Sequence, residues 1–331
     1  MKRIPVPFSC LGIAIFLLLT ACGSNADSST AVVLPATKTS VPSTDTPAPT
    51  ATGLPPTETP VPPTVTLTPT LAIPAVLEIG STVIDGDGSV LVYVPEGKFI
   101  MGKKEDKKLF FTPEDNALPE HEVILDAFWI DQTEVSNGQY KACVDAGKCP
   151  PPMINEAELS SANFGNPKYD NYPVVNVLWE NAVSYCSWVN RRLPTEAEWE
   201  KAARGTDGRL YPWGNKLPWD MIEKNDILLN YNQSKIDTTT PVDEYKNGAS
   251  PYGAYNMAGN VSEWVADWFS ATYYEISPSR NPLGPDKPDE YHGHVLRGGS
   301  YAEGLWTTIA TARRMTVPFA QMIGFRCARS E

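Results

Sequence analysis

Arg191-Arg-Leu-Pro-Thr-Glu-Ala-Glu-Trp-Glu-Lys-Ala-Ala-Arg-Gly205 carries the clearest helix signal in this sequence. Thr195 follows a proline and stands three residues before Glu198, which is the capping-box pattern of a helix start. Gly205 can adopt the left-handed backbone conformation that ends a helix. The stretch therefore predicts a helix from Thr195 to about Arg204.

Weaker patterns on both sides of this stretch predict a mixture of helices and short strands. Turn-forming sequence dominates after Gly205, so we expect long irregular segments held by disulfides or bound ions. The predicted elements are two strands around a turn at Pro95–Gly97 within 90–102, a strand over 122–130, a helix over about 136–146, a helix from a cap at Asn176 through Asn190, and short strands at 295–296 and 324–327.

The charge of the chain lies almost wholly in its later part. The 331 residues include 27 Lys and Arg against 39 Asp and Glu, a net charge of -12. Residues 1–75 hold three basic and three acidic residues, which leaves 24 basic and 36 acidic residues after them. This balance argues against nucleic acid as a partner, because such proteins need a basic face. All nine Trp also follow residue 75, so this part can bury a sizeable core.

Residues 1–21 have the pattern of an export signal. Lys2 and Arg3 precede a short apolar run that ends in Leu19-Thr-Ala-Cys22. This ending resembles a bacterial lipobox, which implies that Cys22 is lipidated and becomes the first residue of the mature chain. We therefore expect an exported protein, anchored in the membrane by the lipid on Cys22 and lying on the outer face of a bacterial membrane. The alternative is an ordinary secretory signal.

Residues 22–76 are rich in Thr, Pro, Ser and Ala and predict a disordered, extended tether. Thirteen of the 31 Pro lie before Val76. The expected globular domain is 77–331, and no later run of 18 apolar residues predicts a transmembrane helix.

Four cysteines remain after Cys10 and Cys22, and an exported location allows them to form disulfides. Cys143 and Cys149 bracket a short turn and can pair locally, which leaves Cys186 for Cys327. Structural zinc is the alternative, although the chain has only three His and no Cys-x-x-Cys. A Cys/His/Asn protease arrangement is a further alternative, weakened if the cysteines are paired.

Six motifs in order resemble the formylglycine-generating enzyme, or sulfatase-modifying factor, domain family over about 88–330. They are Asn171–Val177, Arg191–Gly205, Tyr211–Gly214, Asn256–Trp264, Leu296–Tyr301 and Gly324–Cys327. The resemblance implies an α+β fold, the formylglycine-generating-enzyme variant of the C-type-lectin-like fold, with little regular secondary structure. It also implies a Cys186–Cys327 disulfide.

The resemblance implies Ca²⁺ on the Asn-x-x-Gly-Asn-x-x-Glu segment. The ligands would be the side chains of Asn256 and Glu263 and the carbonyls of Gly259 and Val261, which are the oxygen donors that a hard cation prefers. A second family site would fall on Asn230, Tyr231 and Ile236. There the acidic ligand of the family aligns near Ser234, so the donor set is incomplete.

The sequence departs from the family where its oxidases hold copper(I). The resemblance implies two thiolates soon after Gly-Gly-Ser, because soft ligands suit that ion. Glu303 stands at the first position and Thr308 lies near the second, and Ser262 replaces a pocket Trp. Of the inner pocket only Ser300 remains, so copper is not expected. Ser262, Ser300, Glu303 and Thr308 are the pocket candidates.

Two functions of different classes follow. The first is a tethered binding or scaffolding module whose loops, including Glu303, Trp306 and the segment 270–292, meet an unidentified protein, peptide or glycan. The second is an enzyme: a formylglycine-generating oxidase or a related metal-dependent oxidoreductase that acts on a protein or small thiol. A non-haem iron centre would need His292, His294 and a carboxylate, either Glu290 or Glu303.

Overall fold

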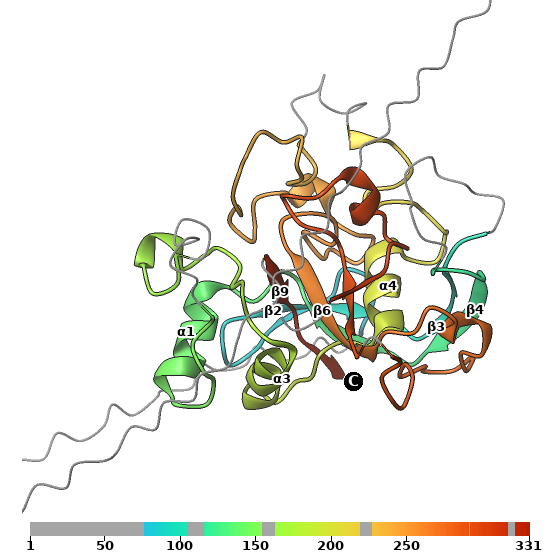
Figure 1. The fold of residues 1–331 in the computed structure, drawn as a ribbon, viewed down its shortest axis with the longest axis horizontal. Helices are drawn as coiled ribbons and strands as arrows, with labels where there is room; N and C mark the ends of the chain where they lie inside the picture. The colour runs from blue at the N-terminus through green and yellow to red at the C-terminus, as the bar shows by residue number, and fades with distance from the viewer. Residues whose placement is uncertain (1–75, 105–115, 154–162, 219–226, 291, 317–321) are drawn as a thin grey trace, which may run out of the picture. The chain divides into compact units, whose positions relative to one another are not determined.

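Helix α4, Glu196–Arg204, forms where its sequence predicts it in the computed structural model (Figure 1). The Thr195 hydroxyl accepts a hydrogen bond from the Glu198 amide, and the Glu198 carboxylate accepts one from the Thr195 amide at 2.8 Å. Gly205 has φ 67° and ends the helix. The capping-box prediction is confirmed.

The structure describes residues 76–104, 116–153, 163–218, 227–290, 292–316 and 322–331. All of them belong to one unit of the chain, Thr64–Glu331. The expected signal 1–21, the lipidation site Cys22 and nearly all of the expected tether 22–76 lie outside these residues. Within them, no helix has the length and apolar character needed to cross a membrane.

Three small sheets and a few short helices make up the described part. The strands are β1 (Thr82–Ile84), β2 (Val90–Val94), β3 (Gly97–Met101), β4 (His121–Leu125), β5 (Phe128–Asp131), β6 (Ser262–Trp268), β7 (His294–Arg297), β8 (Arg314–Thr316), β9 (Ile323–Phe325) and β10 (Ala328–Ser330). The α-helices are α1 (Asn137–Asp145), α3 (Trp179–Trp188) and α4, and short 3₁₀ turns are η2 (Pro167–Tyr169), η5 (Lys246–Gly248), η6 (Tyr273–Glu275) and η7 (Leu305–Thr308). The predicted α+β class, with little regular secondary structure, is confirmed.

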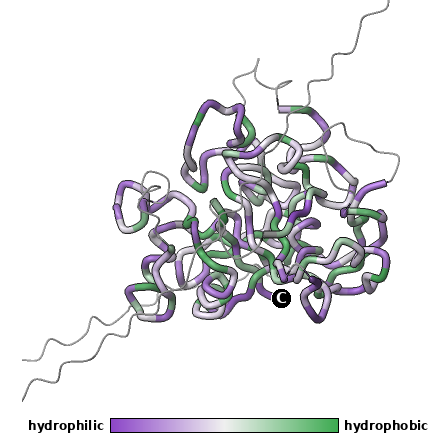
Figure 2. The backbone as a smooth tube through the Cα atoms, in the orientation of Figure 1, coloured by the Kyte–Doolittle hydropathy of each residue, from purple (hydrophilic) through white to green (hydrophobic). Residues whose placement is uncertain are grey.

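The sheets have the strand orders β1-β2-β5-β10, β3-β4 and β8-β7-β6-β9. All neighbours are antiparallel except β6 and β9, which pair in parallel with Glu263 opposite Gly324. The largest apolar cluster joins all three sheets to α4, and Trp199 on α4 is fully buried within it. Figure 2 shows hydrophobic colours on the central strands and hydrophilic colours on outlying loops.

The two strand predictions near the start of the domain need correction. The strands within 90–102 form, but they do not pair with each other, because β2 pairs with β1 and β5 while β3 pairs with β4. The single strand predicted over 122–130 is two strands, β4 and β5. The chain breaks at Asp126 because its amide and its carboxylate are both bonded to Asn281 rather than to a strand.

Helix α1 agrees with its prediction, whereas the start of α3 does not. Ser136 caps α1 through a capping box with Gln139. Helix α3 begins at Trp179 after Leu178, and no side chain caps it. Asn176 instead has φ 60°, and its side-chain oxygen accepts a hydrogen bond from the Met322 amide. The Asn176 side chain, which the local sequence predicts as a helix cap, is therefore used in a tertiary contact with the segment around Met322.

Candidate functional site

The segment Asn256–Glu263 leads into β6 and brings polar groups into the interior. Asn256 and Asn260 have φ of 54° and 61°, a conformation that Asn tolerates better than most residues. Both amide groups donate hydrogen bonds of 2.9 Å to the carboxylate of Glu134. We call Glu134, Asn256, Asn260, Glu263 and Arg326 the buried polar cluster.

Glu263 lies at the centre of this cluster and is fully buried. Its carboxylate accepts two hydrogen bonds from Arg326, at 2.7 and 2.6 Å, and one from the indole of Trp199 at 2.8 Å. Arg326 also donates to the backbone carbonyls of Asp131, Gln132 and Tyr255. An ion pair held this firmly is part of the fold.

The buried polar cluster holds two carboxylates and one guanidinium. Burial is the main cause that raises the pKa of Glu134 to about 7, the Glu263 charge raises it further, and Arg326 opposes the shift. When both carboxylates are ionised, the cluster carries one unbalanced negative charge. A proton or a bound cation would balance it.

The expected calcium ligands belong to one short segment, and one of them has an oxygen without a hydrogen-bond partner among the described residues. The side-chain oxygen of Asn256 is buried and has no hydrogen-bond partner among the described residues. Glu263 supplies a carboxylate, and Gly259 and Val261 belong to the same turn. The arrangement fits a hard cation in donor type, although Arg326 already neutralises Glu263.

The residues expected to bind a second calcium ion pack against those expected to bind the first. The Asn260 amide donates to the Asn230 carbonyl at 2.8 Å, and a Cβ on Gly259 would lie 2.2 Å from that same oxygen. The side-chain oxygen of Asn230 is also buried without a partner among the described residues. Tyr231 donates its amide to the Ser234 hydroxyl at 2.9 Å, and Ile236 is half-buried. Ser234 thus supports the loop where the family has an acidic ligand.

Three of the four pocket candidates meet in one cluster, together with Arg314. The Glu303 carboxylate accepts hydrogen bonds from the Ser262 hydroxyl at 3.1 Å and the Ser300 amide at 2.9 Å. Arg314 binds both carboxylate oxygens of Glu303, one at 2.8 Å, and donates to the Ser262 hydroxyl at 2.8 Å. We call Ser262, Ser300, Glu303 and Arg314 the rim cluster.

The fourth candidate, Thr308, is used differently. It is fully buried at the end of η7, and its hydroxyl donates to the Leu305 carbonyl at 2.8 Å. By contrast, the side chains of Glu303 and Arg314 are 26% and 25% exposed. The Glu303–Arg314 pair of the rim cluster is therefore partly accessible to a ligand, whereas Ser262 and Ser300 are buried and Thr308 contributes to the structure of the turn.

Sequence reasoning missed Glu134 and did not distinguish Arg314 from the other arginines. Glu134 has no local signal, because its partners lie more than 100 residues away. Arg297, Arg313 and Arg326 are buried and each forms an ion pair with a buried carboxylate. Arg314 is the exception, since its partner is partly exposed.

The structure does not gather the histidines into a metal centre. The His294 ring is stacked between Trp179 and Trp268, with ring centres 3.8 and 3.7 Å apart. Burial lowers its pKa to about 4. His292 and Glu290 are exposed. Over the described ranges, no group of three or more His, Cys, Asp and Glu is placed to hold a metal ion.

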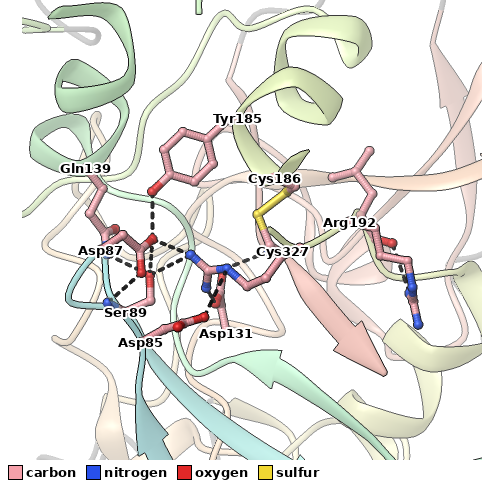
Figure 3. The surroundings of a disulfide bond; sticks show 11 residues. Asp85, Asp87, Ser89, Asp131, Gln139, Tyr185, Cys186, Arg192 and Cys327 are labelled. Carbon is pink, nitrogen blue, oxygen red and sulfur yellow. Dashed lines mark hydrogen bonds and ion pairs between the residues drawn. A yellow bond between two sulfur atoms is a disulfide. The ribbon is translucent and has the colours of Figure 1, made fainter. Parts of the chain in front are cut away.

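Both expected disulfides are bonded in the structure, Cys143 with Cys149 and Cys186 with Cys327. The second joins α3 to the residue before β10. Beside it Arg191 forms ion pairs with Asp85, Asp87 and Asp131. Figure 3 shows these three aspartates near the disulfide. Burial, opposed by Arg191, raises the pKa of Asp131 to about 6. This network fixes the β1–β2 turn against α3.

Comparison with known proteins gives consistent matches. Residues 83–331 match the sulfatase-modifying factor enzyme 1-like domain family. The chain is 32% identical over 287 residues to formylglycine-generating enzyme of Mus musculus, covering 72% of this chain and 74% of that one. It is 34% identical over 169 residues to inactive C-alpha-formylglycine-generating enzyme 2 of Bos taurus, covering 47% and 50%. Among solved structures, PvdO from Pseudomonas aeruginosa has a TM-score of 0.62 at 24% identity, covering 77% of this chain and all of that one.

Proposed function

The chain belongs to the sulfatase-modifying factor family, and we propose that it is a binding or scaffolding module of this family rather than an oxidase. The observation that carries the proposal is the rim cluster. The Glu303–Arg314 ion pair, with the Ser262 hydroxyl, occupies the place where the family resemblance puts the copper site.

Copper does not fit the residues present. Of the six cysteines, four are in disulfides and the other two lie within residues 1–75. A carboxylate, a guanidinium and two serines offer no thiolate to a soft monovalent ion. We therefore derive no oxidation step for this chain. The bovine relative is an inactive C-alpha-formylglycine-generating enzyme by name, which supports the idea that the fold serves members without the activity.

The rim cluster offers a ligand both charge signs on one partly exposed surface. An exposed ion pair can exchange its partners for those of a ligand at small cost, because solvent has already weakened it. Trp306 is half-buried on the neighbouring turn and can add an apolar contact. A peptide or glycan bound by a partly polar surface fits these groups.

Location is the second part of the proposal. A lipid on Cys22 would hold the protein on the outer face of a bacterial membrane, and residues 22–76 would set the binding domain at a distance from it. Labelling of growing cells with a radioactive fatty acid should mark the full chain. The Cys22→Ser variant should remain unlabelled.

Calcium is the third part. Asn256, Glu263 and the carbonyls of Gly259 and Val261 would hold the ion, and it would balance the excess charge of the buried polar cluster. Asn230, Tyr231 and Ile236 are the weaker candidates for a second ion. With calcium at about 100 times its Kd, stability should rise by about 3 kcal/mol. The rise should disappear in Asn256→Ala and on addition of a chelator.

Copper binding and thiol oxidation test the central proposal. The purified chain is titrated anaerobically with copper(I) and incubated with a Cys-x-Pro-x-Arg peptide, whose mass is then measured. We expect neither tight copper binding nor aldehyde formation. The Ser262→Cys, Glu303→Cys double variant places two thiols at neighbouring positions of the rim cluster and serves as the matched positive control for copper binding.

The alternative is an oxidase or a related metal-dependent oxidoreductase, which the relationship to formylglycine-generating enzyme favours. Conversion of the peptide thiol to an aldehyde by the unmodified chain would establish that alternative. A screen of immobilised peptides and glycans addresses the binding role. Ligands retained by the unmodified chain and lost by Arg314→Gln would locate binding at the rim cluster.

A further inference from the structure

A groove of 940 Å³ opens at the other end of β6 from the rim cluster. Ser262 of the rim cluster begins this strand, and Ala266, four residues later, lines the groove. At about 3.3 Å per residue the two positions are roughly 13 Å apart. Helix α3, the start of α4 and the last residues of the chain also line the groove, and Figure 1 marks the C-terminus close to both helices.

About half of the lining residues are apolar, and they include two aromatic rings, Tyr93 and Trp179. Leu283 stands at its edge and is 73% exposed, so its side chain is available to a ligand. The other apolar lining residues are Leu125, Ala127, Val183, Leu193, Ala266 and Pro282.

One wall of the groove is held in place by backbone hydrogen bonds. The Ile124 amide of β4 donates to the Ser279 carbonyl at 2.7 Å, and the Asn281 amide donates to the Ile124 carbonyl at 2.9 Å. Arg280 and Asn281 both bind the Asp126 carboxylate. The wall is therefore preformed, which lowers the ordering cost of binding.

Charge on the groove is predominantly negative. Its lining includes four carboxylates and one guanidinium, that of Arg192. Arg192 binds Glu198 through both oxygens, at 2.6 and 2.7 Å, and Asp126 is bound by Arg280 as described above. Two carboxylates, those of Glu96 and Glu331, remain without a cationic partner at hydrogen-bond distance among the described residues.

These two carboxylates act on the same ring. Glu331 accepts a hydrogen bond of 3.3 Å from the Tyr93 hydroxyl, and both acidic groups raise the pKa of Tyr93 beyond the effect of burial. The buried cation Lys201 donates to the carbonyls of Pro95 and Gly97, on either side of Glu96, at 2.7 and 3.0 Å. The free charge at the mouth of the groove is therefore negative.

A strand edge also faces the groove. Strand β10 pairs with β5 on one side, where the Cys327 carbonyl accepts a hydrogen bond from the Asp131 amide. On the opposite side, the backbone amide and carbonyl of Ala328 form hydrogen bonds with those of Arg192. Successive residues of a strand alternate in direction, so the amide and carbonyl of Ser330 face the same outer side as those of Ala328. Ser330 lines the groove, and its backbone can pair with an extended peptide.

We propose that this groove binds an extended basic segment of a partner protein, in which Lys or Arg side chains flank an apolar side chain. The apolar side chain packs against the lining near Leu283, the cations face Glu96 and Glu331, and the backbone pairs with Ser330. This binding site is separate from the rim cluster and does not depend on the function proposed for it.

Fluorescence anisotropy of a labelled Lys-Val-Lys-Leu-Lys peptide against the purified full chain tests the proposal. Ser187→Trp fills the groove from the exposed side of α3 and should weaken binding at least tenfold. Glu96→Gln removes one free carboxylate and should weaken it about threefold at low salt. Glu275→Gln changes another exposed acidic residue, outside the groove, and should leave the affinity unchanged. Circular dichroism checks that each variant folds.

Five results would overturn the proposal. The peptide fails to bind, or Ser187→Trp binds it as tightly as the unmodified chain. Spermine displaces the peptide at equal charge concentration, which would indicate a general cation site. Arg314→Gln weakens binding as much as Ser187→Trp, which would place the peptide at the rim cluster. Ultracentrifugation that shows a dimer abolished by Ser187→Trp would instead assign the groove to a second copy of the chain.

Discussion

The buried polar cluster and the rim cluster both contain a carboxylate bound through two oxygens to a guanidinium, but the two pairs differ in their exposure to water. The side chains of Glu263 and Arg326 are both 0% exposed, whereas about a quarter of Glu303 and of Arg314 is exposed. A buried pair is costly to break, because each partner would be left as an unpaired charge in a medium of low dielectric. An exposed pair is cheap to break. The same chemical pair thus serves the fold at one place and is available to a ligand at the other.

The largest effect should come from Arg326→Met. The substitution leaves the carboxylates of Glu134 and Glu263 buried without their cation, so we expect a loss of about 3 to 5 kcal/mol in the free energy of unfolding. Urea denaturation measures it. Addition of Glu263→Gln to this variant should recover part of the loss, and a double variant no more stable than the single one would contradict the ion-pair account.

Gly259→Ala tests how closely the buried segments pack. The added Cβ would lie 2.2 Å from the Asn230 carbonyl oxygen, and the residue has φ of 82°. We expect destabilisation of about 2 to 4 kcal/mol from overpacking and backbone strain. Gly147→Ala is the matched control, because Gly147 has φ of 68° with nothing near its Cβ position. Thermal unfolding of both variants should separate the effect of the contact from that of backbone strain. Equal losses of stability in the two variants would show that the contact with Asn230 contributes nothing.

A buried carboxylate should also make stability depend on pH. The pKa of Asp131 rises from 3.8 to about 6 on folding, mainly through burial. Its contribution is therefore present below about pH 4 and is lost as the pH rises through 6, by roughly 2 to 3 kcal/mol. The stability of the unmodified chain relative to Asp131→Asn should fall by this amount between pH 4 and 7. A difference that stays constant or grows would show that Arg191 outweighs burial.

The smallest effect on stability should come from the rim cluster. Glu303→Gln breaks a partly exposed ion pair and should cost less than about 1 kcal/mol, as measured by urea denaturation. The same variant should lose the peptide or glycan ligands that the rim cluster holds. A loss of stability as large as that of Arg326→Met would end the distinction between the two clusters.

Local sequence predicted the parts of the fold that are set by neighbours along the chain. The capping box at Thr195 and the bracketed pair Cys143–Cys149 involve residues a few positions apart, and both are found. The prediction failed at Asn176 and at Asp126, where contacts with Met322 and Asn281 replace the local pattern. The candidate calcium ligands and Glu303 were identified from motifs that resemble those of the family, whereas no sequence motif pointed to Glu134.

The sequence by itself determined the family, the fold class and the absence of thiols where the copper of the oxidases would be held, because these depend on residue types and their order. It could not decide which acidic residue meets which arginine. Folding brings groups more than 100 residues apart into one interior and sets the exposure of each, and exposure controls the energy of a charge. Only the tertiary structure separated Arg326, which stabilises the core, from Arg314, which faces solvent beside Glu303.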